Sequence, residues 1–280
     1  MTEYFAGVDI GSTMTKVVIM ADAVVARVVG ASGPEHRRLA NRVMESALAD
    51  AGLGFSDIAY VVATGYGRIN VPFADRQITE ISCHARGVAS LVPAARTVID
   101  IGGQDCKGIK LKDGRAVDFV MNDKCAAGTG RFLEVIAEAL GLSLEEMGEL
   151  SLQSQHDIEI SNTCTVFAEQ EVVAKLAEGV AVADLAVGVH KAIATRIHGM
   201  VRRLKVEREV VVTGGGALNT GLVRALETKL GLPLLVSPEP LLSGAIGAAL
   251  LGKDTVRDAA EKGIPVTRSR QPLKEATFFS

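Results

Sequence analysis

Two cysteines of this chain lie in short polar segments rich in small residues, an unusual setting for a core side chain. Cys125 lies in residues 122–130 (NDKCAAGTG), and Cys164 lies in residues 161–165 (SNTCT). A cubane iron–sulfur cluster is held by four thiolates, and this pair supplies two. If both cysteines are ligands, the other two come most simply from a second copy of the chain. The pattern therefore favours one cluster shared across a two-fold axis.

Three glycine-rich loops suggest a second kind of chemistry, phosphate binding. Residues 9–16 (DIGSTMTK) place a carboxylate at a strand end beside a turn of small residues, residues 100–105 (DIGGQD) repeat the design, and residues 213–217 (TGGGA) follow a buried strand. Backbone N–H groups of such turns cradle phosphate oxygens, and a carboxylate can hold hydrated Mg²⁺. Glycines also let the backbone approach a base or ribose closely. Together, in this order, the loops predict a nucleotide site.

The loops give a defined set of candidate residues. Asp9 and Asp105 are the carboxylates suited to Mg²⁺, and Gln104 is suited to orient a water at a γ-phosphate, so these three are the candidate catalytic residues. The candidate nucleotide-binding residues, which offer backbone N–H groups, hydroxyls or charge, are Gly11, Ser12, Thr13, Thr15, Lys16, Asp100, Gly102, Gly103, Gly214, Gly215, Gly216 and Ala217.

Composition excludes several classes of protein. The 280 residues are 48% hydrophobic with a formal net charge of −3, which fits a globular protein and gives no basic footprint for nucleic acid. No apolar run reaches the roughly 18 residues of a transmembrane helix, and the start, Met1-Thr2-Glu3-Tyr4, has no basic segment of a signal peptide. We therefore expect a cytoplasmic protein with no membrane or nucleic-acid partner. Its four cysteines are expected to be free, catalytic or metal-binding.

The elements that must position these loops follow from hydrophobic periodicity and turn residues. Strands are predicted at residues 4–10, 16–20, 24–29, 58–63, 97–101, 107–111, 116–121, 209–213 and 234–236. Helices are predicted at residues 35–51, 79–91, 131–140, 143–150, 165–179, 183–204, 222–230 and 243–251. The two halves begin alike, with VDIG at residues 8–11 and IDIG at residues 99–102. The pattern is that of a duplicated α/β lobe.

The order of the three loops, followed by SGAIGAA at residues 243–249, resembles the superfamily of actin, sugar kinases and the large heat-shock chaperones. The resemblance implies duplicated ribonuclease-H-like lobes with a nucleotide cleft between them. Lobe I would be residues 1–96, with the helix at 243–263 returning to it. Lobe II, with the cluster cysteines, would be residues 97–242. Residues 264–280, ending in Phe278-Phe279-Ser280, would be a loosely attached tail.

Within that superfamily, residues 122–134 (NDKCAAGTGRFLE) and 161–169 (SNTCTVFAE) resemble the ATP-dependent activators of 2-hydroxyacyl-CoA dehydratases. The larger family includes ATPase subunits of benzoyl-CoA reductases and activators of double-cubane-cluster reductases. The resemblance implies a homodimer with one bridging [4Fe–4S] cluster ligated by Cys125 and Cys164 of each protomer. Two ATP/ADP sites would drive a low-potential electron to a partner iron–sulfur enzyme, and ferredoxin or flavodoxin would reload the cluster.

Helix starts next to both cysteines fit an anionic cluster. The helix predicted near Gly130 follows Cys125, and another begins at Thr165 directly after Cys164. Helix N-termini stabilise anions, so two copies would direct four N-termini at one cluster.

Other functions remain open at this stage. A small-molecule kinase of the same fold would need a catalytic base and a substrate pocket, and it would have no use for Cys125 and Cys164 at helix starts. A non-catalytic ATP-binding regulator would lack ATP turnover, and the ATPase subunit of a benzoyl-CoA-type reductase is a further alternative. Cys83 and Cys106 are interpreted as packing thiols.

Overall fold

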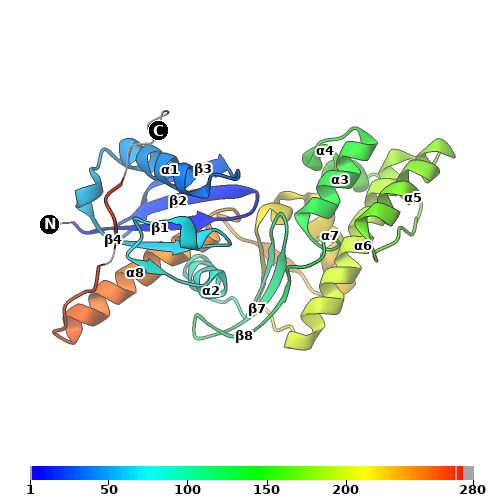
Figure 1. The fold of residues 1–280 in the computed structure, drawn as a ribbon. Coiled ribbons are helices and arrows are strands. Elements are labelled where there is room, and N and C mark those ends of the chain that lie inside the picture. The colour runs from blue at the N-terminus through cyan, green and yellow to red at the C-terminus, as the bar shows by residue number, and fades with distance from the viewer. Residues whose placement is uncertain (1, 269, 274–280) are drawn as a thin grey trace. The chain divides into compact units, whose positions relative to one another are not determined.

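The structure is a computed structural model that describes residues 2–268 and 270–273. The chain folds as two compact units. Unit 1 comprises the chain up to Pro93, the short segment Gly114–Ala116 and the chain from Leu241 on, and unit 2 comprises Ala94–Asp113 and Val117–Pro240. No helix in the described part of the chain is long and apolar enough to cross a membrane. Each unit is built on one five-stranded sheet (Figure 1).

The sheet of unit 1 has the strand order β3-β2-β1-β4-β5. Its elements are β1 (Tyr4–Ile10), β2 (Met14–Met20), β3 (Val24–Ala31), α1 (His36–Ala51), β4 (Ile58–Thr64), β5 (Arg76–Gln77), α2 (Glu80–Leu91) and α8 (Ser243–Glu261), with 3-10 turns at Phe55–Asp57 and Arg68–Asn70. β1 is antiparallel to β2 and parallel to β4. α1 covers one face of the sheet, and α2 and α8 cover the other (Figure 1). Side chains of β1 point to both faces of the sheet: Val8 packs in the core between the sheet and α1, and Phe5 packs in the core between the sheet and α8.

Glycines bring α8 into close contact with its neighbours in unit 1. A Cβ at Gly7 of β1 would lie 1.9 Å from the carbonyl oxygen of Ala245, and one at Gly87 of α2 would lie 1.9 Å from that of Ser243. A Cβ at Gly247 of α8 would lie 1.7 Å from the carbonyl oxygen of Cys83. Only glycine fits at these three points, so backbone packs directly on backbone.

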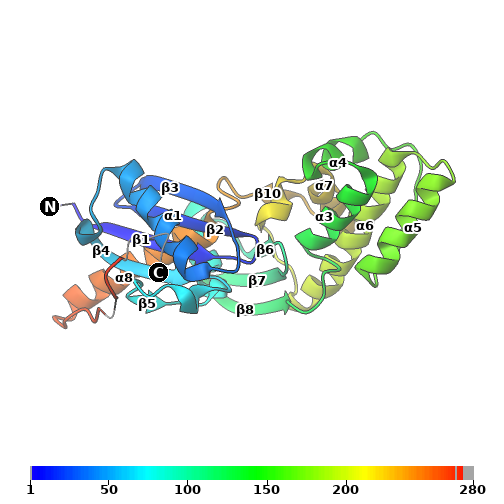
Figure 2. The ribbon, with the colours of Figure 1, turned by 45° about the horizontal axis from the view of Figure 1, so that its top comes forward.

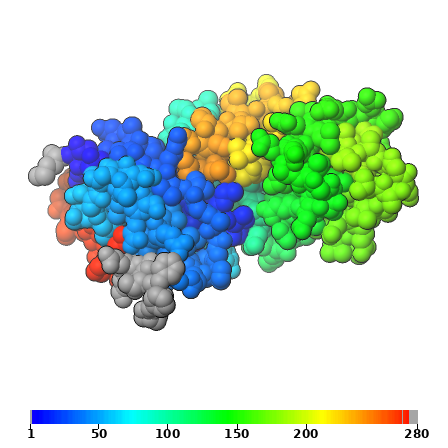
Figure 3. All heavy atoms as spheres, turned by 90° about the horizontal axis from the view of Figure 1, so that it is seen from above, coloured from blue at the N-terminus to red at the C-terminus, as the bar shows by residue number. Residues whose placement is uncertain are grey.

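The sheet of unit 2 has the strand order β10-β9-β6-β7-β8. Its elements are β6 (Thr97–Ile101), β7 (Cys106–Lys112), β8 (Arg115–Asn122), α3 (Gly130–Leu140), α4 (Leu144–Ser151), α5 (Thr165–Ala177), α6 (Val182–Val201), β9 (Val210–Thr213), α7 (Thr220–Leu230) and β10 (Leu234–Val236), with 3-10 turns at Arg202–Leu204 and Gly215–Leu218. One core joins β6 and β9 to α3, α6 and α7. The atoms of α3 to α6, green to yellow-green, form a continuous surface in Figure 3, and Figure 2 shows these helices as ribbons.

The two sheets share one topology, which confirms the predicted duplication. β6 is antiparallel to β7 and parallel to β9, as β1 is to β2 and β4. Position by position, Asp100 pairs with Lys107 across β6 and β7, and Asp9 pairs with Lys16 across β1 and β2. Each unit therefore carries the same carboxylate–lysine pair at the same place in its sheet.

Most predicted elements form, with differences at their ends. Thr79 is the N-cap of α2 rather than its first residue. Ser143, which the Ser-x-x-Glu pattern of residues 143–146 predicts as a cap, is the N-cap of α4. Each accepts a hydrogen bond from a backbone N–H three residues on. α8 continues to Glu261, ten residues beyond the end predicted from periodicity and two short of the 243–263 helix that the resemblance implied. The two-residue strand β5 was not predicted. β6 and β10 have the predicted bounds.

The described part of the predicted tail makes contacts with unit 1. The guanidinium of Arg270 lies 5.0 Å from the ring centroid of Phe55, and its Nη1 lies 3.6 Å from Oδ2 of Asp75. The backbone N–H of Gln271 donates to the carbonyl of Pro72 at 2.9 Å, and Leu273 packs against the α1 core. The Phe278-Phe279-Ser280 end of the predicted tail lies outside the described residues.

Candidate functional site

The first predicted phosphate loop connects β1 to β2 in unit 1. Asp9 is buried, and its Oδ2 lies 3.2 Å from Nζ of Lys16. Gly11 closes the turn by donating its N–H to the carbonyl of Met14 at 3.0 Å. Thr15 is fully buried, and its hydroxyl lies 3.0 Å from that of Ser32. Of the other candidates here, Ser12 is half-buried and Thr13 is exposed.

The second predicted phosphate loop connects β6 to β7 in unit 2. Nζ of Lys107 lies 3.1 Å from Oδ2 of Asp100 and 2.8 Å from Oδ1 of Asp105. The Lys107 side chain is only 3% exposed, whereas that of Asp105 is 25% exposed. The N–H of Gly102 donates to the carbonyl of Asp105 at 3.0 Å, which closes the turn. Gln104 is exposed at the loop surface. The loop thus exposes the side-chain amide of Gln104 to solvent, while the ion pair of Asp100 and Lys107 is buried.

The third loop follows β9 and packs against the second. Gly214 has a φ of 83°, and a Cβ there would lie 2.7 Å from Oδ1 of Asp100 and 2.4 Å from the carbonyl oxygen of Ile101. Gly215 is exposed with open space around it, while Gly216 and Ala217 are buried. The structure therefore brings Asp100, Gly102, Gly103 and the Gly214–Gly216 glycines together within unit 2.

Unit 1 has a counterpart of this third loop after β4. Gly65 has a φ of 84°, and a Cβ there would lie 2.4 Å from Oδ1 of Asp9 and 2.5 Å from the carbonyl oxygen of Ile10. Gly67 lies against the side chain of Ile10 as Gly216 lies against that of Ile101. Sequence analysis missed this role, although the shared pattern Thr-Gly-x-Gly at residues 64–67 and 213–216 carries the signal.

The four cysteines divide into two kinds. Cys83 and Cys106 are buried, as predicted for packing thiols, whereas Cys125 and Cys164 are partly exposed, and all four are free. Burial raises the pKa of the Cys83 thiol to about 12 and raises that of Cys106 as well. Metal ligation needs the thiolate, so the two buried thiols are poor ligands. The exposure of the other two fits the pair predicted to hold a cluster.

The Cys125 loop is fixed on both sides within unit 2. Asn122, the last residue of β8, donates its side-chain amide to the carbonyls of Cys125 at 2.8 Å and Ala127 at 3.0 Å. The hydroxyl of Thr129 donates to the carbonyl of Ala126 at 2.8 Å. Gly128, with a φ of 92°, reverses the chain between these bonds. The thiol is therefore presented by an ordered turn.

The Cys164 loop is anchored from α5 and α6. Oε2 of Glu171 accepts the N–H of Ser161 at 2.9 Å, and a Cβ at Gly188 would lie 2.7 Å from the carbonyl oxygen of Ile158, so the chain runs close to α6. Farther upstream in the chain, Ser154, Gln155 and His156 donate hydrogen bonds to the buried carboxylate of Asp184 in α6. These bonds hold the pKa of Asp184 well below its usual range. Cys164 itself is the N-cap of α5.

Both predicted helix starts next to the cysteines form, with α3 beginning at Gly130 and α5 at Thr165. The N–H groups of Gly130 and Arg131, the first two residues of α3, donate to the carbonyls of Gly102 and Gly103 at 2.8 Å each. Two N–H groups at the start of α3 are therefore bonded to the second glycine-rich loop. That the two helix starts face a cluster stays a prediction.

Residues 6–252 of the chain match the model of the BadF/BadG/BcrA/BcrD ATPase family. The chain belongs to this family of ATPases. It is 50% identical over 255 residues to the activator of lactoyl-CoA dehydratase of Anaerotignum propionicum, with 88% of this chain and 96% of that protein covered. It is 33% identical to a benzoyl-CoA reductase component of Thauera aromatica, with 88% and 92% covered.

Solved structures confirm the fold expected for this ATPase. The activator of the 2-hydroxyisocaproyl-CoA dehydratase of Clostridium difficile, solved with bound ADPNP, superposes with a TM-score of 0.86 at 45% identity, covering 92% of this chain and 97% of that one. The ethanolamine utilization protein EutJ of Carboxydothermus hydrogenoformans and a ROK-family glucokinase of Streptomyces griseus share the fold at 14% identity, with TM-scores of 0.58 and 0.56. The predicted actin/sugar-kinase-like fold is thus confirmed.

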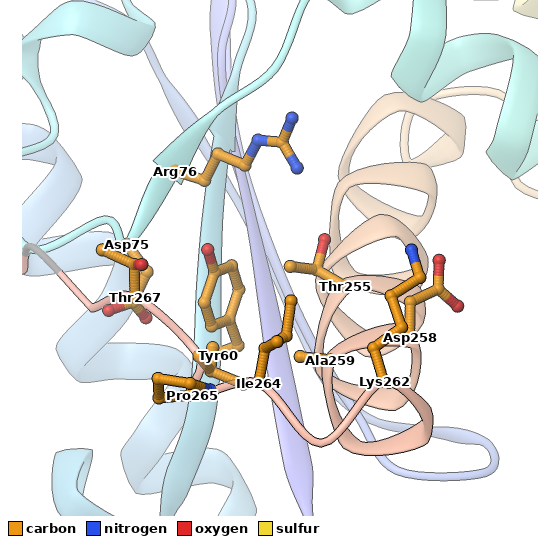
Figure 4. A pocket seen from close by; sticks show the side chains of 11 residues that line it. Tyr60, Asp75, Arg76, Thr255, Asp258, Ala259, Lys262, Ile264, Pro265 and Thr267 are labelled. Carbon is orange, nitrogen blue, oxygen red and sulfur yellow. The ribbon is translucent and has the colours of Figure 1, made fainter.

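A cavity of about 480 Å³ lies elsewhere in unit 1 of this ATPase. Its lining includes Tyr60 of β4, Arg76 of β5, Thr255 of α8, the C-cap residue Lys262 and the chain around Pro265 (Figure 4). None of its lining residues belongs to the three phosphate loops or the cysteine segments. It carries both charge signs and no cluster of groups that favours one ligand.

Sequence analysis also missed Lys107 of this ATPase, which bridges two of the predicted carboxylates. The signal was the seven-residue spacing from Asp100 to Lys107, which repeats the spacing from Asp9 to Lys16. Among the residues that the structure describes, no three His, Cys, Asp or Glu side chains gather as a metal site.

Proposed function

We propose that this ATPase is a reductive activator, which uses ATP hydrolysis to deliver a low-potential electron to a partner iron–sulfur enzyme such as a 2-hydroxyacyl-CoA dehydratase. The reductant is ferredoxin or flavodoxin, and each donated electron passes to the partner while ATP and water become ADP and phosphate. The observation that carries the proposal is the pair of half-exposed thiols, Cys125 and Cys164, on ordered loops beside a nucleotide-binding unit. Relatives named as dehydratase activators support the same reading.

The two thiols are suited to a [4Fe–4S] cluster shared by a homodimer. Each chain supplies two thiolates of the four that a cubane needs, and the remaining thiols, Cys83 and Cys106, are too deeply buried to join them. When bound, the cluster would supply one-electron chemistry at low potential. Asn122 and Glu171 hold the two cysteine loops in place through backbone bonds. Free thiols fit a reducing compartment such as the cytoplasm.

The phosphate loops assign roles to the nucleotide residues. We propose that the N–H groups of loop residues 11–13, 102–104 and 214–216 bind ATP phosphates and the nucleoside, that Asp9 and Asp105 hold hydrated Mg²⁺, and that the exposed Gln104 orients the attacking water. Lys16 adds positive charge beside the first loop. Thr15 and Asp100 are buried and bonded within the protein, so they support the loops from beneath.

Iron content tests the cluster. Anaerobically purified dimer should contain about four irons, and Cys125→Ala or Cys164→Ala should abolish iron binding. Cys83→Ala is the matched control, because it removes a buried thiol and should leave iron content unchanged. Four irons in a Cys125→Ala protein would refute the ligand assignment.

ATP turnover tests the catalytic assignments. Gln104→Ala should reduce hydrolysis more than ATP affinity, since an amide that orients water contributes to the transition state. Asp9→Asn and Asp105→Asn should lose Mg²⁺-dependent hydrolysis. ATP-dependent reduction of a purified dehydratase would then show the complete reaction, and ATP hydrolysis without electron delivery would refute the coupling.

A second candidate is the ATPase subunit of a benzoyl-CoA-type reductase, which the 33% identity to the Thauera aromatica reductase component favours. That protein would work in a hetero-oligomer. Purification of a stable homodimer that activates a dehydratase would exclude it.

A further inference from the structure

Two main-chain hydrogen bonds connect the second phosphate loop to the cysteine segment. The N–H of Gly130 donates to the carbonyl of Gly102, and that of Arg131 donates to the carbonyl of Gly103, each at 2.8 Å. We call this pair of bonds the α3 bridge. Gly130 is buried, Gly102 and Gly103 are half-buried and Arg131 is exposed, so the bridge runs from the interior of unit 2 to its surface.

The carbonyls of the bridge belong to peptide groups of the loop that is proposed to bind phosphate. A peptide unit is planar, with its C=O and N–H on opposite sides. The carbonyl of Gly102 shares a peptide with the N–H of Gly103, and the carbonyl of Gly103 shares one with the N–H of Gln104. Bonding at one side of a peptide polarises the other side. A phosphate that binds these two N–H groups therefore moves and polarises the carbonyls that hold α3.

In unit 1, the corresponding bonds to the β1–β2 loop come from a residue next to the end of a strand. After β3, Ser32 donates its N–H to the carbonyl of Thr13 at 2.8 Å and its hydroxyl to the carbonyl of Gly11 at 2.7 Å. Ser32 follows the end of β3 directly. In unit 2 the bonds come from Gly130 and Arg131, eight and nine residues beyond the end of β8 at Asn122. The extra chain holds Cys125.

We propose that the α3 bridge transmits the state of the nucleotide to Cys125. The cysteine loop is suspended between two fixed points, the side chain of Asn122 at one end and the bridge at the other. A displacement of the Gly102–Gln104 loop moves the bridge end, while the Asn122 end stays with the sheet. This inference rests on the proposed function and names the route by which nucleotide acts on the cysteine site.

Gly130 is the positioning residue of the bridge. A Cβ at this position would lie 3.0 Å from the carbonyl oxygen of Gly102 and 3.3 Å from Cα of Gly103. Alanine therefore displaces the phosphate loop from α3 by a few tenths of an ångström without changing any polar side chain. Gly199 of α6 is the matched control, because a Cβ there meets no atom within 4 Å.

The test measures alkylation of Cys125 by iodoacetamide in full-length, metal-free protein with ADP and with a non-hydrolysable ATP analogue. Peptide mass spectrometry separates Cys125 from Cys164. In the unsubstituted protein and in Gly199→Ala, we expect the two nucleotides to change the Cys125 rate by about five-fold or more. In Gly130→Ala the ratio of the two rates should fall below about two-fold. Circular dichroism and ATP affinity establish that the variant is folded and binds nucleotide.

A Gly130→Ala protein that keeps the full ratio would overturn the proposal, as would an unsubstituted protein whose Cys125 rate is the same with both nucleotides. Should Gly130→Ala fail to fold, amide exchange at Gly130 and Arg131 in the unsubstituted protein decides, because the bridge predicts different rates with the two nucleotides and equal rates refute it. The measurement uses no metal. Its outcome is therefore independent of iron content, which tests the proposed function.

Discussion

Removal of the buried lysine beneath the second phosphate loop should destabilise unit 2 strongly. Nζ of Lys107 lies between the carboxylates of Asp100 and Asp105, at 3.1 and 2.8 Å, and the side chains of Lys107 and Asp100 are 3% and 4% exposed. Lys107→Met keeps most of the aliphatic stem but removes the charge. Breaking a buried ion pair in this way costs about 3–5 kcal/mol, because the remaining charge stays buried without its partner.

The duplicated pair in unit 1 provides an internal control. Lys16 is 15% exposed and contacts one carboxylate, that of Asp9, at 3.2 Å. Water can partly replace the lysine there, so Lys16→Met should cost only about 1–2 kcal/mol. The strand register and the residue types of the pair are the same in both units, so the comparison tests the combined effect of deeper burial and of the second carboxylate on Lys107.

Native-state hydrogen exchange is the suitable assay, because a chain of two compact units does not unfold in one two-state step. Amides of β6 report on unit 2 and amides of β1 report on unit 1. At 1.4 kcal/mol per factor of ten, Lys107→Met should lower β6 protection by about two to three and a half orders of magnitude. Lys16→Met should lower β1 protection by about one order of magnitude.

A second substitution tests the cause. Asp100→Asn in the Lys107→Met background removes the buried charge that the first change left alone, so β6 protection should recover in large part. A loss below about 1 kcal/mol in Lys107→Met, or an equal loss in Lys16→Met, would refute the argument from burial.

Three further changes have defined outcomes. Burial lowers the pKa of His190 from 6.5 to about 4, so the unfolded chain binds a proton here more readily than the folded chain, and unit 2 loses stability as pH falls from about 6.5 to about 4. His190→Leu should remove about 3 kcal/mol of that loss, measured by hydrogen exchange of the α6 amides. An unchanged pH profile would contradict this. At pH 8 iodoacetamide should label Cys83 and Cys106 at least about ten-fold more slowly than the two motif cysteines of metal-free protein, by peptide mass spectrometry, and fast labelling of either would disprove their burial. Gly214→Ala, at a φ of 83° with its Cβ 2.4 Å from a carbonyl oxygen, should cost about 1–3 kcal/mol of strain and weaken ATP binding in calorimetry, and normal affinity would exclude close approach at this loop.

Hydrophobic runs bounded by turn residues predicted strand bounds well. β6 and β10 have the predicted bounds, because an apolar run between turn residues leaves few alternatives. Periodicity alone placed the end of α8 at Leu251, ten residues too early, since Gly252 is an interior residue packed near Tyr60 and Val62 rather than a C-cap. A glycine that ends a helix and one that admits a neighbour have the same sequence signature.

Side-chain and backbone contacts over long range could not be predicted. The bond of Lys107 to two carboxylates depends on strand register, and the bonds of Gly130 and Arg131 to the phosphate loop are made by backbone atoms, which any residue possesses. No sequence pattern therefore indicated that the first N–H groups of α3 bond to this loop. The nucleotide and cluster roles of the candidate residues remain predictions.

The glycine contacts of α8 have a mechanical consequence. At Gly7, Gly87 and Gly247 the backbones of β1, α2 and α8 meet without side chains between them. Flexible side chains at a contact can accommodate small displacements by changing rotamer, whereas two backbones in direct contact cannot adjust in this way. A displacement of the β1–β2 loop is therefore expected to move α2 and α8 together with β1. We therefore expect β1, α2 and α8 of unit 1 to move as one rigid body.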